Sequence, residues 1–150
     1  MVEVERTLFF IKPDGVERKL IGQCVQRIEE RGLRVVGAKM VWLTWQQAEL
    51  HYIEHKDKPH FKALLNSITK GPVMMFVFQG PNAVKIVRSE LGPAKDPPKG
   101  TIRGDLATSI SENVAHAADS RKAAKREIKL HFALTELLDK ERASGPSIDE

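Results

Sequence analysis

A run of six apolar residues constrains the fold of this chain more than any other feature. The run, VMMFVF, occupies residues 73–78 and follows Gly71 and Pro72. A continuous apolar run bounded by turn residues is typical of a buried strand. Residues 6–12 (RTLFFIK) form a second run of β-forming residues, which Pro13 ends. The pattern therefore predicts a sheet with two central strands, covered by helices.

Helix signals alternate with further strand signals along the chain. Apolar residues share one face of the segment 21–31, and Gly32 follows as a helix stop. Thr44 and Gln47 match a capping box, which indicates a helix start. This order of signals predicts an α+β fold with a βαββαβ core and a helical insertion. We expect helices over residues 21–31, 44 to about 55, 60–70, 82–92 and 120–131, and further strands over 33–43 and 113–118.

Two segments lack a regular pattern. Residues 92–104 (GPAKDPPKGTIRG) contain three prolines and three glycines, too many for a helix or a central strand. We expect a surface loop at about 92–106, and long loops in compact domains often carry function. The C-terminal tail, about 139–150, has little apolar surface to bury, so we expect it on the surface or against a neighbouring subunit.

Composition excludes several classes of protein. A chain of 150 residues is expected to form one domain, residues 1–150, which needs no disulfide or structural metal. The single cysteine, Cys24, and the absence of a leader-like start favour a cytoplasmic protein, and no segment is apolar enough to span a membrane. The formal charge of +4 suggests an anionic partner but does not distinguish nucleic acid, a membrane surface and a phosphorylated metabolite.

Three cations and one histidine are candidates for chemistry on a phosphate. Lys12, Arg88 and Arg103 lie at or near predicted bends, where a phosphate needs donors. The segment PPKGT does not match a Walker phosphate loop, so a nucleotide would be bound without one. Of the five histidines, four fall in predicted helices and favour a surface or half-buried interpretation. His116 differs because it lies among small residues, in NVAHAADS, at a strand-to-helix junction.

The segments RTLFFIKPDGVERKLIG, GTIRGD and NVAHAADS, in this order and spacing, resemble the signature segments of nucleoside diphosphate kinases. The resemblance extends from about Glu5 to Leu138 and includes HY at residues 51–52, KDKPHF around Pro59 and GPV at Gly71. It implies a ferredoxin-like sandwich with an antiparallel sheet covered by helices. It also implies ping-pong transfer of a γ-phosphoryl group from a nucleoside triphosphate to a nucleoside diphosphate.

The resemblance assigns four residues to the catalytic machinery. His116 corresponds to the nucleophile that becomes a phosphohistidine, and Glu127 to the carboxylate that orients it. Tyr52 corresponds to the tyrosine that buttresses the site. Lys12 corresponds to a cation that offsets charge on the transferring group.

A second set is implied to bind the nucleotide. Lys12, Arg88 and Arg103 correspond to the phosphate-binding cations, Asn113 to the ribose-binding asparagine, and His60 to the position that stacks on the base. Mg²⁺ is implied to arrive with the nucleotide phosphates rather than in a protein cage. The implied partners are nucleoside tri- and diphosphates and further copies of the chain, in a hexamer or, less favoured, a tetramer.

The sequence departs from the family pattern at several positions. The usual HGSD reads His116, Ala117, Ala118 and Asp119, so the serine hydroxyl that helps tie the histidine to the glutamate is missing. A phosphate-contacting threonine is replaced by Ala94, and we expect Lys95, Thr101 or no residue to take over that contact. The stacking position carries His60 in place of a larger aromatic ring.

Two alternatives follow from these observations. One is a degenerate family member that binds nucleotide or serves as a scaffold. The other is a nucleic-acid-binding domain on a ferredoxin-like sheet, suggested by the basic segment 121–129. Against the second, the aromatic signature of an RNA-recognition motif is absent, and Trp42 and Trp45 are interpreted as core or subunit-interface residues. We interpret the basic segment as a solvated face.

Overall fold

The structure is a computed structural model that describes residues 4–140. Its centre is a four-stranded sheet formed by β1 (Val4–Ile11), β2 (Arg34–Val41), β3 (Val73–Pro81) and β4 (Ala115–Ala117). The strand order is β2-β3-β1-β4, and every pairing is antiparallel. The two predicted central strands, β1 and β3, occupy the middle of the sheet, and the ferredoxin-like α+β prediction is confirmed.

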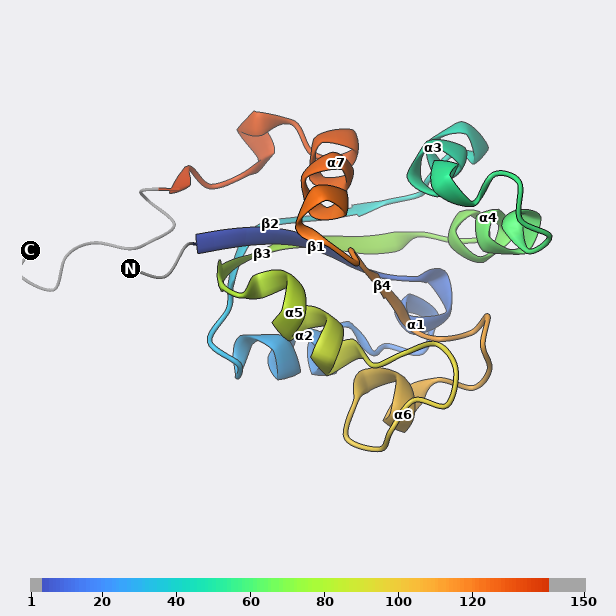
Figure 1. Cartoon of the computed structure of the whole chain (residues 1–150), viewed down its shortest axis with the longest axis horizontal. Coiled ribbons are helices and arrows are strands. Elements are labelled where there is room, and N and C mark those ends of the chain that lie inside the picture. The colour runs from blue at the N-terminus through green and yellow to red at the C-terminus, as the bar shows by residue number, and fades with distance from the viewer. Residues whose placement is uncertain (1–3, 141–150) are drawn as a thin grey trace, which may run out of the picture.

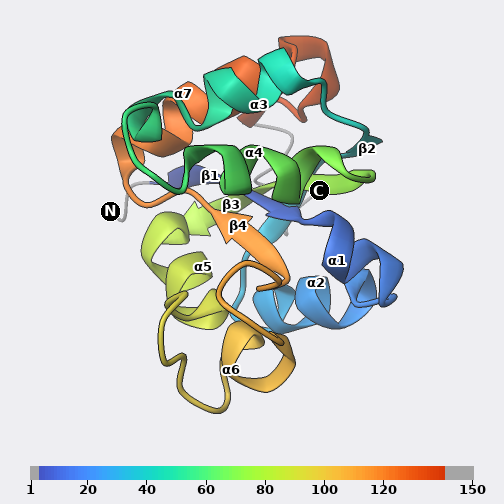
Figure 2. The same ribbon diagram turned by 90° about the vertical axis from the view of Figure 1, so that its right-hand side faces the viewer.

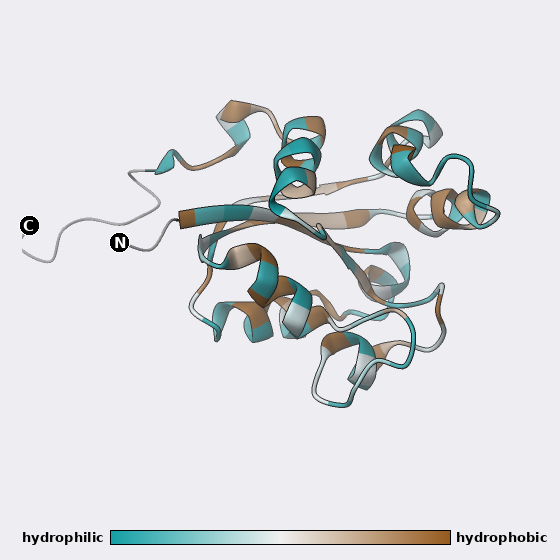
Figure 3. Ribbon diagram, viewed as in Figure 1, coloured by the Kyte–Doolittle hydropathy of each residue, from teal (hydrophilic) through white to brown (hydrophobic). Residues whose placement is uncertain are grey.

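Helices cover both faces of the sheet (Figures 1 and 2). On one face lie α3 (Trp45–His51), α4 (Phe61–Thr69) and α7 (Arg121–His131), and on the other α2 (Ile21–Glu29) and α5 (Ala83–Leu91). The side chains of β1 alternate between the two resulting cores. Leu8 and Phe10 pack with the first group, and Phe9 and Ile11 with the second. Figure 3 shows brown apolar residues alternating with teal hydrophilic ones along the helices that cover the sheet.

Local signals place several helix ends correctly. The Thr44 side chain and the Gln47 side chain form the expected reciprocal capping box at the start of α3. Ser120 accepts a hydrogen bond from the Ala123 amide at the start of α7. Gly92 ends α5 with a φ of 84°, a conformation that favours glycine. Asn82 stands at the N-cap of α5, but its side chain makes no capping bond.

Two short helices occupy segments that were expected to be turn or loop. Pro13–Glu17 forms α1, because Pro13 at the first helical position preorganises the backbone and Asp14 lies in the first turn. Ile102–Leu106 forms α6, so the expected loop at about 92–106 ends at Thr101. The Thr101 side chain caps α6 by accepting from the Gly104 amide. A cap and five following residues are too short a pattern to indicate a helix from the sequence alone.

Two predicted elements are shorter than expected. The helix expected to reach about His55 ends at His51; Tyr52 leaves helical geometry, and Ile53–His55 forms a 3₁₀ turn, η1. The buried Tyr52 ring is a tertiary feature, and no glycine or proline marks this break in the sequence. The last strand spans Ala115–Ala117 rather than residues 113–118, since Val114 has a φ of 77° and cannot continue the strand.

The remaining expectations concern the surface. Trp42 and Trp45 are 64% and 43% exposed in this chain, so the interpretation of these residues as core residues is wrong. Trp42 donates a hydrogen bond from Nε1 to the Thr69 carbonyl. The basic side chains Arg121, Lys122, Lys125 and Lys129 of α7 are exposed, as expected of a solvated face, although Ala124 and Glu127 are buried. Residues 141–150 of the expected tail lie outside the described residues. Within residues 4–140, no helix is both long and apolar enough to cross a membrane.

Candidate active site

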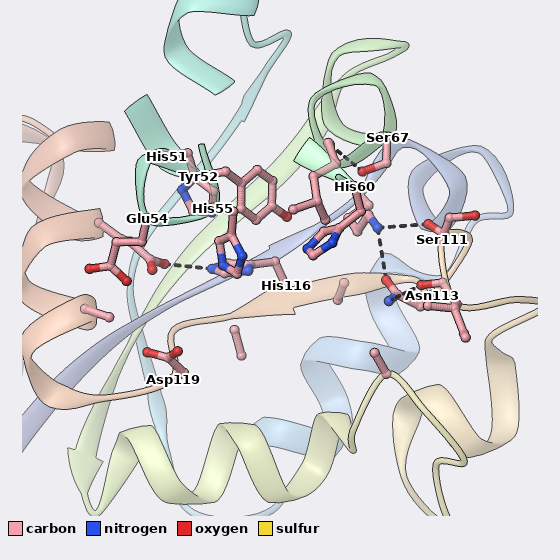
Figure 4. Close-up of a pocket in the computed structure, with 18 of the residues that line it drawn as sticks. His51, Tyr52, Glu54, His55, His60, Ser67, Ser111, Asn113, His116 and Asp119 are labelled. Carbon is pink, nitrogen blue, oxygen red and sulfur yellow. Dashed lines mark hydrogen bonds and ion pairs between the residues drawn. The ribbon is translucent and has the colours of Figure 1, made fainter. Parts of the chain in front are cut away.

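All eight sequence-predicted site residues line one cavity of about 390 Å³. Figure 4 labels four of them, Tyr52, His60, Asn113 and His116. The eight residues come from the ends of β1 and α3, from the start of α4, from α5, α6 and α7, and from the segment around β4. The cavity thus brings together side chains that are more than 100 positions apart in the sequence. The lining set predicted from the sequence consists of Lys12, Tyr52, His60, Arg88, Arg103, Asn113, His116 and Glu127.

His116 is held by contacts on several sides. Its backbone pairs with Phe10 of β1, and the two rings stack with centroids 4.9 Å apart. Its Nε2 lies 2.7 Å from Oε1 of Glu127, a side chain on α7 that is almost fully buried. Within residues 4–140 no hydrogen bond occupies Nδ1 of His116. When Nε2 carries the ring proton and donates it to the carboxylate, Nδ1 presents the lone pair.

Lys12 is a buried cation at the end of β1. Its ammonium donates to Oδ1 of Asn113 and to the carbonyl of Ser111, both at 3.0 Å. Burial lowers the pKa of the Lys12 ammonium to about 8, although nearby Asp14 opposes the effect. Both hydrogen-bond acceptors are neutral. An anion that entered the cavity would therefore supply the negative charge that these partners lack.

The two arginines differ in how firmly they are fixed. Arg103 on α6 donates to three carbonyls, those of Gly92 at 3.1 Å, Asn113 at 3.3 Å and Ala115 at 2.7 Å. Burial lowers the pKa of the Arg103 guanidinium to about 10. Arg88 on α5 is exposed and makes one long bond to the Ala117 carbonyl. Arg103 is therefore preorganised, whereas Arg88 keeps donors available for a ligand.

The backbone before His116 is strained. Val114 has a φ of 77°, which is costly for a β-branched residue. Hydrogen bonds fix it on both sides: the Val114 amide donates to Oδ2 of Asp14, and its carbonyl accepts from the Lys12 amide at 2.8 Å. The turn between Asn113 and Ala115 thus depends on contacts with α1. This turn is what allows Asn113 and His116 to face the same cavity.

Tyr52 and His60 close the cavity on the side of α3 and α4. Tyr52 is buried, and its burial raises the pKa of the phenol above its ordinary value. His60 is exposed at the start of α4, with its ring centroid 5.8 Å from that of His55. An exposed ring at the mouth is available for stacking, as expected for a base-contacting position.

Sequence reasoning missed several residues of the cavity. His51 was interpreted as a surface or half-buried helical residue, but it is 2% exposed, and its ring centroid lies 4.5 Å from that of His116. Nδ1 of His51 lies 2.9 Å from Nε2 of His131. Arg126 holds the carbonyls of Leu50 and His51. The only available signal was the pair HY at positions 51–52, because the other contacts join distant parts of the chain.

The structure shows what surrounds Ala118 and Ala94, the two residues that replace a serine and a threonine of the family pattern. Ala118 packs in an apolar cluster with Val84 and Ala124, and Glu127 reaches His116 without help from a hydroxyl at position 118. Ala94 lines the cavity, but neither Lys95 nor Thr101 does. The Thr101 hydroxyl is already committed to the Pro98 carbonyl and the Gly104 amide. Neither Lys95 nor Thr101 therefore replaces the missing threonine contact in this arrangement.

Comparison with known proteins identifies the family of this chain. A family model described as nucleoside diphosphate kinase matches residues 5–137. This chain belongs to the nucleoside diphosphate kinase family. A nucleoside diphosphate kinase of Archaeoglobus fulgidus is 47% identical over 98% of this chain and 99% of its own length. One of Pyrococcus abyssi is 50% identical over 94% of this chain and 92% of its own length.

Solved structures extend the agreement to three dimensions. The nucleoside diphosphate kinase of Halobacterium salinarum, in complex with CDP, superposes with a TM-score of 0.88 at 43% identity, covering 91% of this chain and 93% of that chain. A family protein of Babesia bovis gives a TM-score of 0.87 at 42% identity, covering 94% of this chain and 97% of that chain. Membership of the family therefore rests on sequence and on fold together.

Proposed function

We propose that this chain transfers the γ-phosphoryl group of a nucleoside triphosphate, typically ATP, to a nucleoside diphosphate, through a phosphohistidine on His116. One observation carries the proposal most directly. Glu127 engages Nε2 of His116, and none of residues 4–140 forms a hydrogen bond with Nδ1, in a cavity lined by Lys12, Arg88 and Arg103. An imidazole with one fixed proton and three surrounding cations suits transfer of a phosphoryl group.

The transfer proceeds in two balanced steps. In the first, the lone pair on Nδ1 of His116 bonds to the γ-phosphorus while the bond to the bridging oxygen breaks, and the nucleoside diphosphate leaves. The imidazole then carries positive charge, which the ionised Glu127 on Nε2 offsets. In the second step, a terminal oxygen of another nucleoside diphosphate attacks the same phosphorus and restores neutral His116. A single cavity serves both steps, which is the basis of ping-pong kinetics.

The cations and polar side chains position the nucleotide. Arg103 and Lys12 are fixed before the substrate arrives, so little ordering is needed when phosphates bind. In this proposal Arg88 supplies further donors from α5, and Asn113 contacts the ribose. His60 at the cavity mouth stacks on the base without a base-specific pattern, which supports the use of different nucleotides.

Mg²⁺ fits this site as a companion of the nucleotide. Mg²⁺ prefers oxygen ligands and binds substrate phosphates readily. Within residues 4–140, one group of three candidate ligands is close enough to hold an ion, and two of its members are histidines. That set does not suit Mg²⁺, so the phosphates would hold it. When bound, the ion supplies positive charge against the phosphate oxygens.

We also propose that the chain works in the cytoplasm as a homo-oligomer, with a hexamer favoured over a tetramer. Large apolar side chains that are exposed in the single chain support association, among them Met40, Trp42, Trp45 and Leu134. Light scattering on the purified protein measures the mass of the particle. A mass equal to that of one chain across micromolar concentrations would contradict the proposal.

Labelling of His116 tests the proposed function. Incubation with γ-labelled ATP is expected to give an acid-labile, base-stable label on the wild type and none on His116→Ala. Glu127→Gln is expected to label at least tenfold more slowly, because the neutral amide no longer offsets the imidazolium charge. Equal labelling of His116→Ala and the wild type would overturn the mechanism.

A turnover assay separates the enzyme from the alternatives. We expect transfer from ATP to GDP at rates that require His116. A folded chain with no turnover would favour the scaffold alternative. Tight RNA binding that weakens steeply with salt would favour the nucleic-acid alternative.

A further inference from the structure

A cluster of potential metal ligands lies directly beside the proposed nucleophile. His51, His116 and Glu127 each offer one ligand atom, and these atoms all lie within 4.8 Å of one another. No other group of three or more histidine, cysteine or acidic side chains in residues 4–140 meets the same condition. The rings of His51 and His116 stand nearly perpendicular, at 80°, with centroids 4.5 Å apart. We call these three residues the histidine cluster.

His51 has an unused nitrogen within this cluster. Its Nε2 is buried and has no hydrogen-bond partner, an arrangement that is rare for a buried polar atom. The residue is 2% exposed and nevertheless contributes to the wall of the cavity. A metal ion would satisfy this lone pair. The orphaned nitrogen is therefore an observation independent of the spacing of the three ligands.

His131 on α7 can set the tautomer of His51. Its Nε2 lies 2.9 Å from Nδ1 of His51. Two neutral imidazoles share one proton across this bond. When His51 donates from Nδ1, its Nε2 bears the lone pair that a ligand needs. A second group that holds the distal nitrogen in this way is the usual support of a metal-binding histidine.

We propose that the histidine cluster binds one divalent transition metal ion such as Zn²⁺, and that the bound ion blocks phosphorylation of His116. The ligands are Nε2 of His51, one imidazole nitrogen of His116 and the carboxylate of Glu127, with a fourth position open to the cavity. Two nitrogens and one carboxylate with an open position form a common zinc donor set. The ligand atoms need to converge slightly, because atoms bound at about 2 Å from one ion lie at most ~4 Å apart.

A bound ion blocks phosphorylation because it leaves no free lone pair on Nδ1 of His116. If the ion binds Nδ1, it occupies the nucleophilic atom. If the ion binds Nε2, the ring proton resides on Nδ1, which then has no lone pair. Either mode also draws Glu127 toward the metal. This consequence rests on the proposed function, whereas the binding itself does not.

Metal binding is tested first without nucleotide. Zn²⁺ alone, buffered by a chelator of known affinity, is titrated into the wild type, where one ion per chain is expected. We expect His51→Gln to weaken binding at least 100-fold and His131→Phe, which removes no ligand, to weaken it by about 10- to 100-fold. His60→Gln is the matched control, because it alters a cavity histidine outside the cluster, and its Zn²⁺ affinity is expected to match the wild type.

Three outcomes would overturn the site. They are no binding by the wild type, wild-type affinity in His51→Gln, and a loss in His60→Gln as large as that in His51→Gln. Because His51 packs against Phe10 and Tyr52, the melting temperature of each variant is measured alongside. If His51→Gln does not fold, His131→Phe decides, and wild-type affinity in that variant overturns the proposal.

The block is tested separately, by labelling with γ-labelled Mg·ATP at increasing Zn²⁺. We expect the label on wild-type His116 to disappear as the ion binds, and to require 10- to 100-fold more Zn²⁺ in His131→Phe. Full labelling of a Zn²⁺-loaded wild type would overturn the blocking role. Labelling absent even without Zn²⁺, together with normal Zn²⁺ binding, would instead mean that the proposed function is wrong and the metal site is right.

Discussion

Lys12 is unusual because its side chain is buried although its ammonium bonds no anionic group among residues 4–140 of the free chain. Its ammonium faces two neutral oxygens, and burial brings its pKa down to about 8. A phosphate bound beside it would favour the charged form and raise that pKa again. Protonation of Lys12 and nucleotide binding are therefore expected to be coupled.

This coupling predicts proton uptake on binding. Above pH 8 most free chains lack the Lys12 proton and must recover it when ADP binds, so affinity falls as the pH rises from 7 to 9. At pH 8.5 we expect uptake of roughly 0.7 proton per ADP, and little at pH 7. Calorimetry in two buffers with different ionisation enthalpies measures it. Lys12→Arg stays charged, so the same uptake in that variant would contradict this origin.

At the scale of elements, α6 matters because it carries Arg103. This helix folds closely over the preceding loop: a Cβ on Gly104 would lie 1.8 Å from the Pro98 carbonyl oxygen. The Thr101 side chain fixes both partners of this contact, since its hydroxyl bonds the Pro98 carbonyl and the Gly104 amide. The position of Arg103 therefore depends on a glycine one residue further along.

Gly104→Ala is expected to disrupt this arrangement. The added methyl group must displace the backbone of Pro98, which should cost roughly 1 to 3 kcal/mol of the free energy of unfolding and reduce affinity for ADP at least tenfold. Gly22→Ala is the matched control, because a Cβ there meets nothing within 4 Å and lies in α2. That change should be neutral or stabilise by up to ~1 kcal/mol. Denaturant unfolding and ADP titration measure both variants; equal behaviour would contradict the role of the close contact.

At the scale of the whole molecule, the contact between His51 and His131 joins α3 to α7. Both imidazoles are neutral in the folded chain, because burial lowers their pKa values below the ordinary 6.5. Below pH 6.5 the unfolded chain binds more protons at these groups than the folded chain. The free energy of unfolding therefore decreases as the pH falls from 6.5 toward 4.

His131→Phe should reduce this acid sensitivity. The pKa of His131 alone, lowered to about 4, corresponds to a loss of roughly 2 to 3 kcal/mol between pH 7 and 4.5. Urea unfolding at one protein concentration, at both pH values, compares the variant with the wild type. The prediction fails if the two proteins lose the same free energy over this range.

The parts of this molecule that could be predicted from the sequence are those encoded by neighbouring residues. The Thr44 capping box, the Ser120 cap and the apolar run of β3 each depend on a few adjacent positions. The helices α1 and α6 were missed because five-residue helices leave almost no periodicity. The end of α3 at His51 was missed because burial of Tyr52, a tertiary effect, decides it.

The site shows the same division. His116 and the three cations could be found because they lie in motifs that resemble those of a known family. The partners of His51 could not, since His131 is 80 positions away and no local pattern encodes their contact. The loss of the serine at position 118 was visible, but only the structure shows that Glu127 reaches His116 without it. Sequence motifs located the chemistry, and packing determined which neighbours surround it.

The strand β4 is short and follows the other three strands in the chain, which matters while the chain is being synthesised. Translation delivers β1, β2 and β3 early, but β4 contributes only Ala115–Ala117, and these pair with Phe9, Phe10 and Ile11. In a nascent chain that lacks β4, this edge of β1 is open. Its unpaired N–H and C=O groups, next to Phe9 and Phe10, could then pair with another chain. Pairing of β4 with β1 therefore protects this edge and, in the same step, brings His116 to the cavity.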